Sequence, residues 1–186
     1  MTNIKNKILT DPIRASLYPV PVTLVTCENK DRDNIITISW TGILCSKPPI
    51  VYISIRPERF SYNLVKDTNK YVINIPSVDL LPIADKCGNI SGRTNDKFEK
   101  FNLSRMKVIQ DYPPLISECK HHLICDVIDI IEFGVHHSFI GKVKYEYINT
   151  DCYESDNRLY DKLSPIAYCR KDYMQLSKKI GHYGFF

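Results

Sequence analysis

The chain has 186 residues, 44% of them hydrophobic, and a formal net charge of +4, so it fits one globular domain. Ile, Val, Tyr and Phe number 24, 11, 12 and 7, whereas Ala and Gly number only 3 and 7. Because branched and aromatic residues favour strands, this composition indicates a β-rich domain and argues against a helix bundle. The mild, scattered positive charge argues against a nucleic-acid partner.

Neither a membrane span nor an export signal is predicted. No apolar run reaches the roughly 18 residues of a membrane helix, and Met1–Asp11 lacks the apolar core of a signal peptide. We therefore expect a cytoplasmic protein without a membrane partner, whose seven cysteines are free thiols. Cys119, His121 and Cys125 would share one strand face, which leaves a metal site as the alternative to packed thiols, although known zinc spacings are absent.

The first half of the chain predicts a hairpin, a third strand and a helix. Strands are expected over Tyr18–Glu28 and Asn34–Thr41, separated by a polar turn, and a third over Ile50–Arg56. Pro57 then stands at the first position of a helix that runs over about Glu58–Lys66, a position where Pro is favoured.

The second half predicts further strands with short helices between them. Two long strands meet near Gly134 and indicate a hairpin. Since strands do not alternate with long helices, a doubly wound parallel sheet is disfavoured, and we expect a mainly β fold. Its form would be an antiparallel barrel, closed or partly closed, with short helices outside. The elements in chain order are strand Lys70–Ile75, helices over 78–87 and 95–101, and strands Arg105–Gln110, His121–Phe133 and His136–Ile148.

The second predicted strand carries a stripe of hydroxyls. Side chains alternate between the two faces of a strand, so every second residue faces the same way. Such a stripe would offer hydrogen bonds to a ligand, or it would be the solvated face of an edge strand. Thr37, Ser39 and Thr41 would lie on one face, and Ile36, Ile38 and Trp40 on the other.

The junction between the third strand and the helix predicts a phosphate site. A helix start presents free N–H groups and the positive end of its dipole, and Arg56 adds a fork of donors there. Ser54, on the same strand face, and Ser61, in the first helical turn, would add hydroxyls. The alternative is an ordinary helix start with surface arginines.

Two further segments are candidates for a ligand site. Cys87–Arg93 follows a helix and contains two glycines, so it would cradle a ligand or simply cap the helix. It does not follow a strand and therefore predicts no dinucleotide-binding turn. Nothing near Cys87 predicts the lowered pKa of a reactive thiol. His136 and His137 would point to opposite faces of their strand, so that one of them faces a pocket.

Taken in order, these segments resemble the flavin reductase-like family, and its flavoredoxin branch in particular. The resemblance runs from residue 18 to the C-terminal Gly181–Phe186 segment. It implies an FMN-binding split β-barrel that forms a homodimer with FMN near the subunit interface. The chain would be one domain over residues 1–186, with a core of about 18–150 and an extension over 151–186 that completes the site or the dimer. The matching segments are Ile36–Gly42, Cys45–Pro49, Ser54–Arg59, Asn74–Pro76, Cys87–Phe98 and His136–His137.

The same resemblance implies a role for each matched residue. The strand around Ser39 would hydrogen-bond the edge of the flavin ring, although strand parity places Trp40 beneath the site as a packing residue. The strand–helix junction would hold the phosphate, and Asn74, the Cys87–Arg93 loop and Lys97 would close the site. His136, with His137 as the near alternative, would be catalytic, and no metal is implied. The implied cofactor-binding residues are Thr37, Ile38, Ser39, Trp40, Thr41, Ser54, Arg56, Pro57, Ser61, Asn74, Cys87, Gly88, Ser91, Arg93 and Lys97.

The activity that the resemblance implies is an NAD(P)H-dependent flavin oxidoreductase, with NAD(P)H as a transient co-substrate. The alternatives are an FMN electron carrier that serves a partner redox protein, and a non-catalytic flavin-binding module. Lys47 and Val135 depart from the family pattern, so the sequence does not choose between NADH and NADPH.

Overall fold

The computed structural model describes residue 10, residues 12–176 and residues 178–184. The Met1–Asp11 stretch lies outside the described residues except for residue 10, as do the last two residues of the Gly181–Phe186 segment. No helix of the described part is long and apolar enough to cross a membrane.

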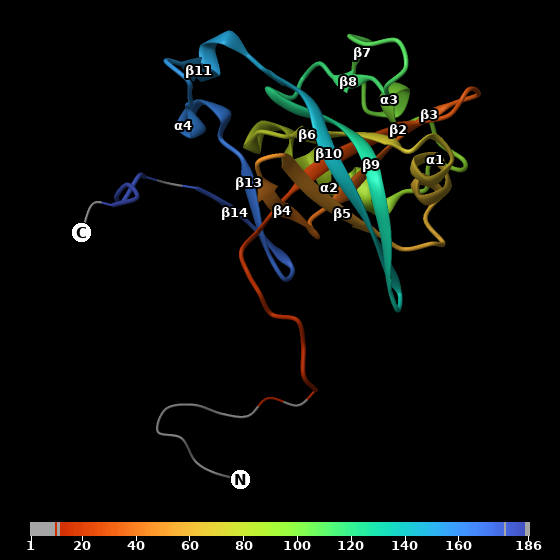
Figure 1. Cartoon of the computed structure of the whole chain (residues 1–186), viewed down its shortest axis with the longest axis horizontal. Coiled ribbons are helices and arrows are strands. Elements are labelled where there is room, and N and C mark those ends of the chain that lie inside the picture. The colour runs from red at the N-terminus through yellow and green to blue at the C-terminus, as the bar shows by residue number, and fades with distance from the viewer. Residues whose placement is uncertain (1–9, 11, 177, 185–186) are drawn as a thin grey trace.

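A seven-stranded antiparallel sheet, curled into a barrel, forms the body of the fold (Figure 1). Only Ser39 and Trp40 separate the strand Asp33–Ile38 from the strand Thr41–Ser46, and these two strands occupy opposite ends of the strand order. The two ends of the sheet therefore lie close together. The expected antiparallel barrel is therefore confirmed. The strand order is β3 (Asp33–Ile38), β2 (Thr23–Glu28), β6 (Lys70–Ile75), β9 (His121–Phe133), β10 (His136–Ile148), β5 (Pro49–Ile55) and β4 (Thr41–Ser46).

The long hairpin of β9 and β10 has the bounds that the sequence predicts. Gly134 turns the chain with a φ of +52°, and His136 pairs with Phe133 beside the turn. Inside the barrel, Gly141 lies against the buried ring of Tyr71. A glycine is needed there, because the Cβ of any other residue would overlap the tyrosine hydroxyl. The barrel core also contains the fully buried Phe139 and Ile53.

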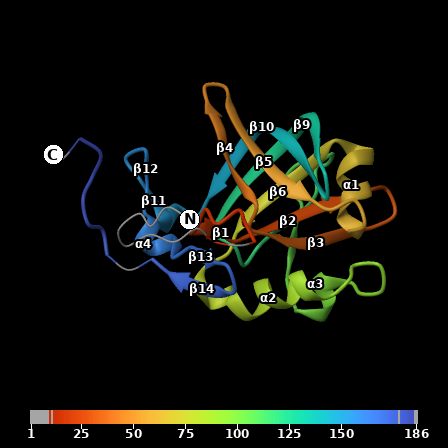
Figure 2. The same cartoon turned by 90° about the horizontal axis from the view of Figure 1, so that it is seen from below.

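The helices pack on both sides of β2 and β3. Leu64 of α1 (Phe60–Thr68) packs in the barrel core with Val25 of β2. Leu24, the neighbour of Val25, points the other way and packs with Ala84 and Phe98 in a second core. These two residues belong to α2 (Leu81–Asn89) and α3 (Lys97–Lys100), which lie along the outer side of the sheet (Figure 2). β3 is therefore held between α1 and the α2–α3 layer.

The C-terminal part of the chain returns to α2. β13 (Ile166–Cys169) pairs with the short β1 (Val20–Pro21) and with β14 (Asp172–Gln175). The Tyr173 hydroxyl donates to the carboxylate of Asp85 on α2 at 2.9 Å. The other short elements are η1 (Val78–Leu80), β7 (Arg105–Met106), β8 (Leu115–Ile116), η2 (Thr150–Cys152), β11 (Tyr153–Glu154), β12 (Asn157–Arg158) and α4 (Tyr160–Leu163).

Several predicted boundaries were wrong. The first strand is interrupted at Val22, whose N–H donates to Ile166 of β13, and the second ends at Ile38 because the chain bends at Trp40 to carry β4 to the far edge. The strand predicted over 105–110 pairs only at its first two residues. Pro57 stands in a turn ahead of α1, and the helix begins at Phe60 with Arg59 as its N-cap residue.

Candidate functional site

Two adjoining pockets lie beside β3, where α1, the end of α2 and the following loop come together. The inner pocket has a volume of about 160 Å³ and the outer pocket one of about 380 Å³. Ile36, Thr37, Arg59 and Gly88 line both pockets, so the two lie side by side in one elongated region. Such a shape suits a ligand with a compact end and a larger, flat end.

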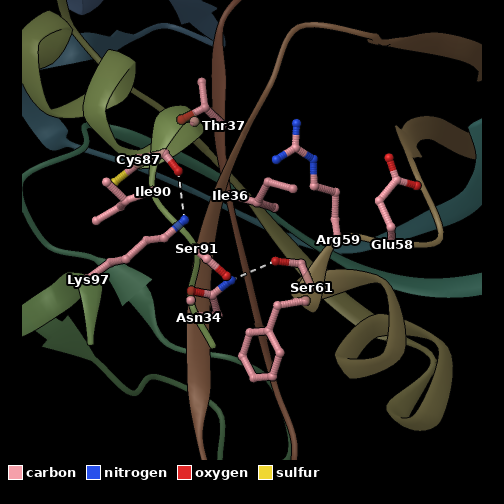
Figure 3. A pocket seen from close by; sticks show the side chains of 13 residues that line it. Asn34, Ile36, Thr37, Glu58, Arg59, Ser61, Cys87, Ile90, Ser91 and Lys97 are labelled. Atoms are coloured by element: carbon pink, nitrogen blue, oxygen red, sulfur yellow. Dashed lines mark hydrogen bonds between the residues drawn. The ribbon is translucent and has the colours of Figure 1, made fainter. Parts of the chain in front are cut away.

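Lys97 supplies a buried positive charge to the inner pocket (Figure 3). Its side chain is 3% exposed, and its ammonium donates to the carbonyls of Ile35 and Cys87, both at 2.6 Å. Burial lowers the pKa of Lys97, and the nearby Arg59 lowers it further. An ammonium has three donors, so one remains after these two bonds.

Arg59 supplies a second positive charge, from the N-cap position of α1. In the described part of the chain, neither Arg59 nor Lys97 forms an ion pair, whereas the neighbouring Glu58 pairs with Arg56 at 3.4 Å. The first turn of α1 presents the positive end of the helix dipole, although the N–H of Tyr62 already donates to the Arg59 carbonyl at 3.0 Å. Glu58 also lines the inner pocket, and Arg59 helps to lower the pKa of its carboxylate, but its ion pair is with Arg56. Two cations with no ion pair of their own among the described residues favour an anion there.

Hydroxyls and a tight loop complete the inner pocket. Ser61 is 1% exposed, accepts a hydrogen bond from the Asn34 amide at 2.8 Å, and also hydrogen-bonds the buried Cys27 thiol. Ser91 accepts a bond from the backbone N–H of Arg93 at 3.2 Å, which leaves its O–H available as a donor. Gly92 lies so close to Asn34 that a Cβ would overlap the amide, which fixes the loop against β3.

Aromatic rings line the outer pocket. Trp40 and His136 lie with their ring centres 4.3 Å apart, and Tyr168 and Tyr173 with theirs 5.6 Å apart. The two tyrosines come from β13 and β14, so the C-terminal strands contribute to this pocket. Because Ser39, Ser54 and Arg56 line the same pocket, its surface suits a flat ring system with a polar edge.

The two histidines have different environments. His136 lines the outer pocket, and burial, followed by the charge of Arg56, lowers its pKa. His137 instead bonds the Tyr62 hydroxyl through Nδ1 at 2.8 Å and does not line either pocket. His136 is therefore the histidine placed to meet a ligand.

The hydroxyl stripe does not form as a single face. Thr37 lines both pockets but donates its hydroxyl to the Ala84 carbonyl at 2.5 Å, and Thr41 is buried and donates to the Tyr52 carbonyl at 2.6 Å. Ser39 lines the outer pocket. The packing role expected for Trp40 is wrong, because its side chain is 46% exposed after the strand ends and the parity is lost.

Asn74 does not lie where the resemblance implied. It is fully buried in the sheet, where its amide donates to the Leu24 carbonyl at 2.9 Å and its oxygen accepts from the Ile116 N–H at 3.0 Å. Cys87 does line the inner pocket, but burial raises the pKa of its thiol to about 11, which opposes a reactive role.

The predicted residues thus divide into two groups. Thr41, Pro57, Asn74, Arg93 and His137 do not line either pocket, whereas the other twelve do. Sequence reasoning missed Arg59, although it stands in the segment already singled out, and it missed Tyr168 and Tyr173, which no local motif marks. Asn89, Ile90 and Gly92 line the pockets as part of the loop that was expected to close the site. The remaining lining residues that were missed are Asn34, Ile36, Ile55, Glu58, Phe60 and Asp85.

The cysteine–histidine cluster considered as a metal site is dispersed. Cys119 packs in the core that faces α2 and α3, while Cys125 packs in the barrel core, so the intervening sheet separates them. Within the described ranges no group of three or more His, Cys, Asp or Glu side chains is arranged to hold a metal. All seven cysteines are free.

Comparison with known proteins gives consistent matches. A family model described as the flavin reductase like domain matches residues 15–177. Flavoredoxin of Desulfovibrio vulgaris (Miyazaki F) superposes with a TM-score of 0.87 and 26% identity, over 96% of this chain and 98% of that chain.

Two further matches come from bacteria. A split barrel domain protein of Shewanella frigidimarina superposes with a TM-score of 0.80 and 16% identity, over 88% of this chain and 85% of that chain. The reductase component of a 4-nitrophenol 4-monooxygenase/4-nitrocatechol 2-monooxygenase from Rhodococcus opacus is 25% identical over 122 residues. That alignment covers 66% of this chain and 62% of the relative. The barrel is therefore a split barrel, as the resemblance implied.

Proposed function

Because this chain belongs to the family of flavin reductase-like domains, we propose that it binds FMN across both pockets and acts as an NAD(P)H-dependent flavin oxidoreductase. The observation that carries the proposal is the pair of cations, Arg59 and Lys97, in an inner pocket that opens into an aromatic outer pocket. FMN has the matching shape and charge, with a phosphate at one end and a flat ring system at the other.

The inner pocket fits the phosphate. A buried cation without a counter-ion is costly, so an anion beside Lys97 would relieve that cost. Arg59 would add a fork of donors, and Ser61 and Ser91 would add hydroxyls, so that four side chains converge on one group. Arg56 lines the outer pocket instead, so in this arrangement it would lie nearer the ribityl chain or the ring than the phosphate.

The outer pocket fits the ring. Bound FMN would accept a hydride from NAD(P)H and pass the electrons on to an acceptor. Trp40 and His136 would present their rings to its flat surface, and Ser39 and Ser54 would present hydroxyls to its polar edge. Since the pKa of His136 is lowered, its imidazole is neutral at neutral pH and can both donate and accept a hydrogen bond.

The second candidate function is an FMN electron carrier for a partner redox protein. The observation that favours it is the likeness to flavoredoxin over 96% of this chain at 26% identity. The exposed indole of Trp40 beside the outer pocket would give such a partner access to the ring.

Rapid mixing with NADH and with NADPH distinguishes the two functions. An oxidoreductase should lose its flavin absorbance at about 450 nm within seconds with at least one nicotinamide. Free FMN at the same concentration, without the protein, gives the background rate. Bleaching no faster than this background would contradict the oxidoreductase. Fast reduction by a protein donor alone would then favour the carrier, and no reduction by either would favour a non-catalytic flavin-binding module.

We further propose that the chain forms a homodimer through the outer face of the barrel beside the outer pocket. Ile131 and Phe133 pair with Ser138 and His136 in the β9–β10 hairpin, so they lie on the same face as the pocket-lining His136. Phe133 is 61% exposed, and Ile43, on β4, is 80% exposed. Such exposed apolar residues are typical of an interface. Light scattering should give twice the chain mass of 21.6 kDa; a monomer at micromolar concentration would contradict it.

A further inference from the structure

We propose that Arg32, Phe60 and Arg93 form a clamp that holds the wall of the inner pocket closed and slows the release of a phosphate-bearing flavin. We call this group the Phe60 clamp. The proposal rests on the proposed function, because it concerns how long FMN stays bound. It bears on whether FMN is a resident cofactor or an exchanging substrate.

Arg32 ties the loop after α2 to the start of α1. Its guanidinium donates to the backbone carbonyl of Gly92 at 2.6 Å and to that of Arg93 at 3.4 Å. The same guanidinium lies over the Phe60 ring, 4.7 Å from its centre. One side chain on the β2–β3 turn therefore contacts both the loop and the first residue of α1.

Arg93 makes the reciprocal connection from the loop. Its guanidinium donates to the backbone carbonyl of Glu58 at 2.9 Å, in the turn ahead of α1, and lies 5.8 Å from the centre of the Phe60 ring. Phe60 is thus contacted by two arginines, each of which also bonds a backbone carbonyl of the wall. Neither arginine lines the pocket, so their role is to position the residues that do.

The Phe60 clamp holds residues that line the inner pocket. Ile90, Ser91 and Gly92 line the inner pocket from the loop, and Phe60 lines it from α1. Gly92 packs against the Asn34 side chain, whose amide donates a hydrogen bond to the Ser61 hydroxyl at 2.8 Å (Figure 3). If the loop moved outward, Ser91 would leave the anion site and the contact between Gly92 and Asn34 would open.

The contacts of the Phe60 clamp are weak enough for the loop to open and close again. Arg32 and Arg93 are exposed, and a cation over an aromatic ring at an exposed site changes an equilibrium constant only a few-fold. The loop is therefore held by several weak contacts rather than by a buried core. Losing one arginine should speed release without unfolding the domain.

The test compares release rates of FMN and riboflavin, which lacks the phosphate, from the full chain. Arg32→Ala removes one ring contact and two hydrogen bonds, and Phe60→Leu removes both ring contacts, so each should release FMN about tenfold faster, with little change for riboflavin. Phe60→Tyr keeps the ring and should retain slow release. Lys66→Ala is the matched control, because Lys66 lies 5.8 Å from the ring of Tyr62 on the same helix but away from the loop.

Hydrogen exchange of the backbone amides of residues 90–95, measured without flavin, gives an independent readout. Exchange should be faster in Arg32→Ala and Phe60→Leu than in the wild type and in Lys66→Ala. Unchanged exchange and unchanged FMN release in both variants would overturn the clamp, as would equal acceleration of riboflavin and FMN. If the wild type binds no FMN, the proposed function fails, while the exchange experiment still decides whether the clamp holds the loop.

Discussion

Replacing Arg59 by Ala tests the phosphate end of the site. Arg59 lines both pockets, forms no ion pair with any described residue, and as N-cap residue makes no side-chain hydrogen bond to α1. Its removal should therefore change the free energy of unfolding by no more than about 0.5 kcal/mol. A hydrogen bond to a charged group contributes about 1.5–3 kcal/mol. Because Arg59 is exposed, we expect the lower part of that range, about tenfold in the dissociation constant of FMN.

The assay is a titration followed by quenching of flavin fluorescence, with FMN and riboflavin in parallel. Arg59→Ala should weaken FMN binding and leave riboflavin binding within about twofold, because only FMN carries the phosphate. Arg56→Ala is the matched control, since Arg56 lines only the outer pocket and pairs with Glu58. If Arg56→Ala weakened FMN binding more than Arg59→Ala did, or if both flavins were affected equally, the phosphate assignment would be refuted.

One other substitution and one pH titration, each with a control variant, probe the scaffold. Gly92→Ala should weaken FMN binding and lower the free energy of unfolding by about 1–3 kcal/mol, because the added Cβ would overlap Asn34. Both effects are measured by FMN titration and by urea unfolding. Gly181→Ala is the control, because a Cβ at Gly181 would have no atom within 4 Å. Burial lowers the pKa of His122 from 6.5 to about 4, so the unfolded chain binds the extra proton and stability falls as the pH drops from 6.5 towards 4. The loss should approach about 3 kcal/mol in urea unfolding, and the same pH dependence in His122→Gln would contradict this cause.

Strong periodicity made some elements predictable. The β9–β10 hairpin matches its predicted bounds because two long runs of strand-forming residues flank Gly134, which takes the positive φ of the turn. β4 was missed because Ile43 and Leu44 are both exposed, so the strand has no alternating pattern to detect. Its existence depends on the distant β5, with which it pairs.

The candidate site was predictable only where its residues lie in local motifs. Ser54 and Arg56 line the outer pocket, whereas Arg59 reaches the inner pocket as N-cap residue of α1, which begins two residues later than expected. The prediction that Asn74 closes the site was not met, because its side chain hydrogen-bonds within the sheet. No local sequence pattern reveals those bonds. Tyr168 and Tyr173 reach the outer pocket through strand pairing between β13 and β14.

The central claim is that one FMN lies across the two pockets with its phosphate at Arg59 and Lys97. Calorimetric titration of the flavin-free wild-type protein with FMN and with riboflavin tests it most directly. The account requires one FMN per chain, bound at least about tenfold more tightly than riboflavin, since the charged contacts act on the phosphate. The absence of saturable FMN binding, or equal affinity for the two flavins, would contradict it.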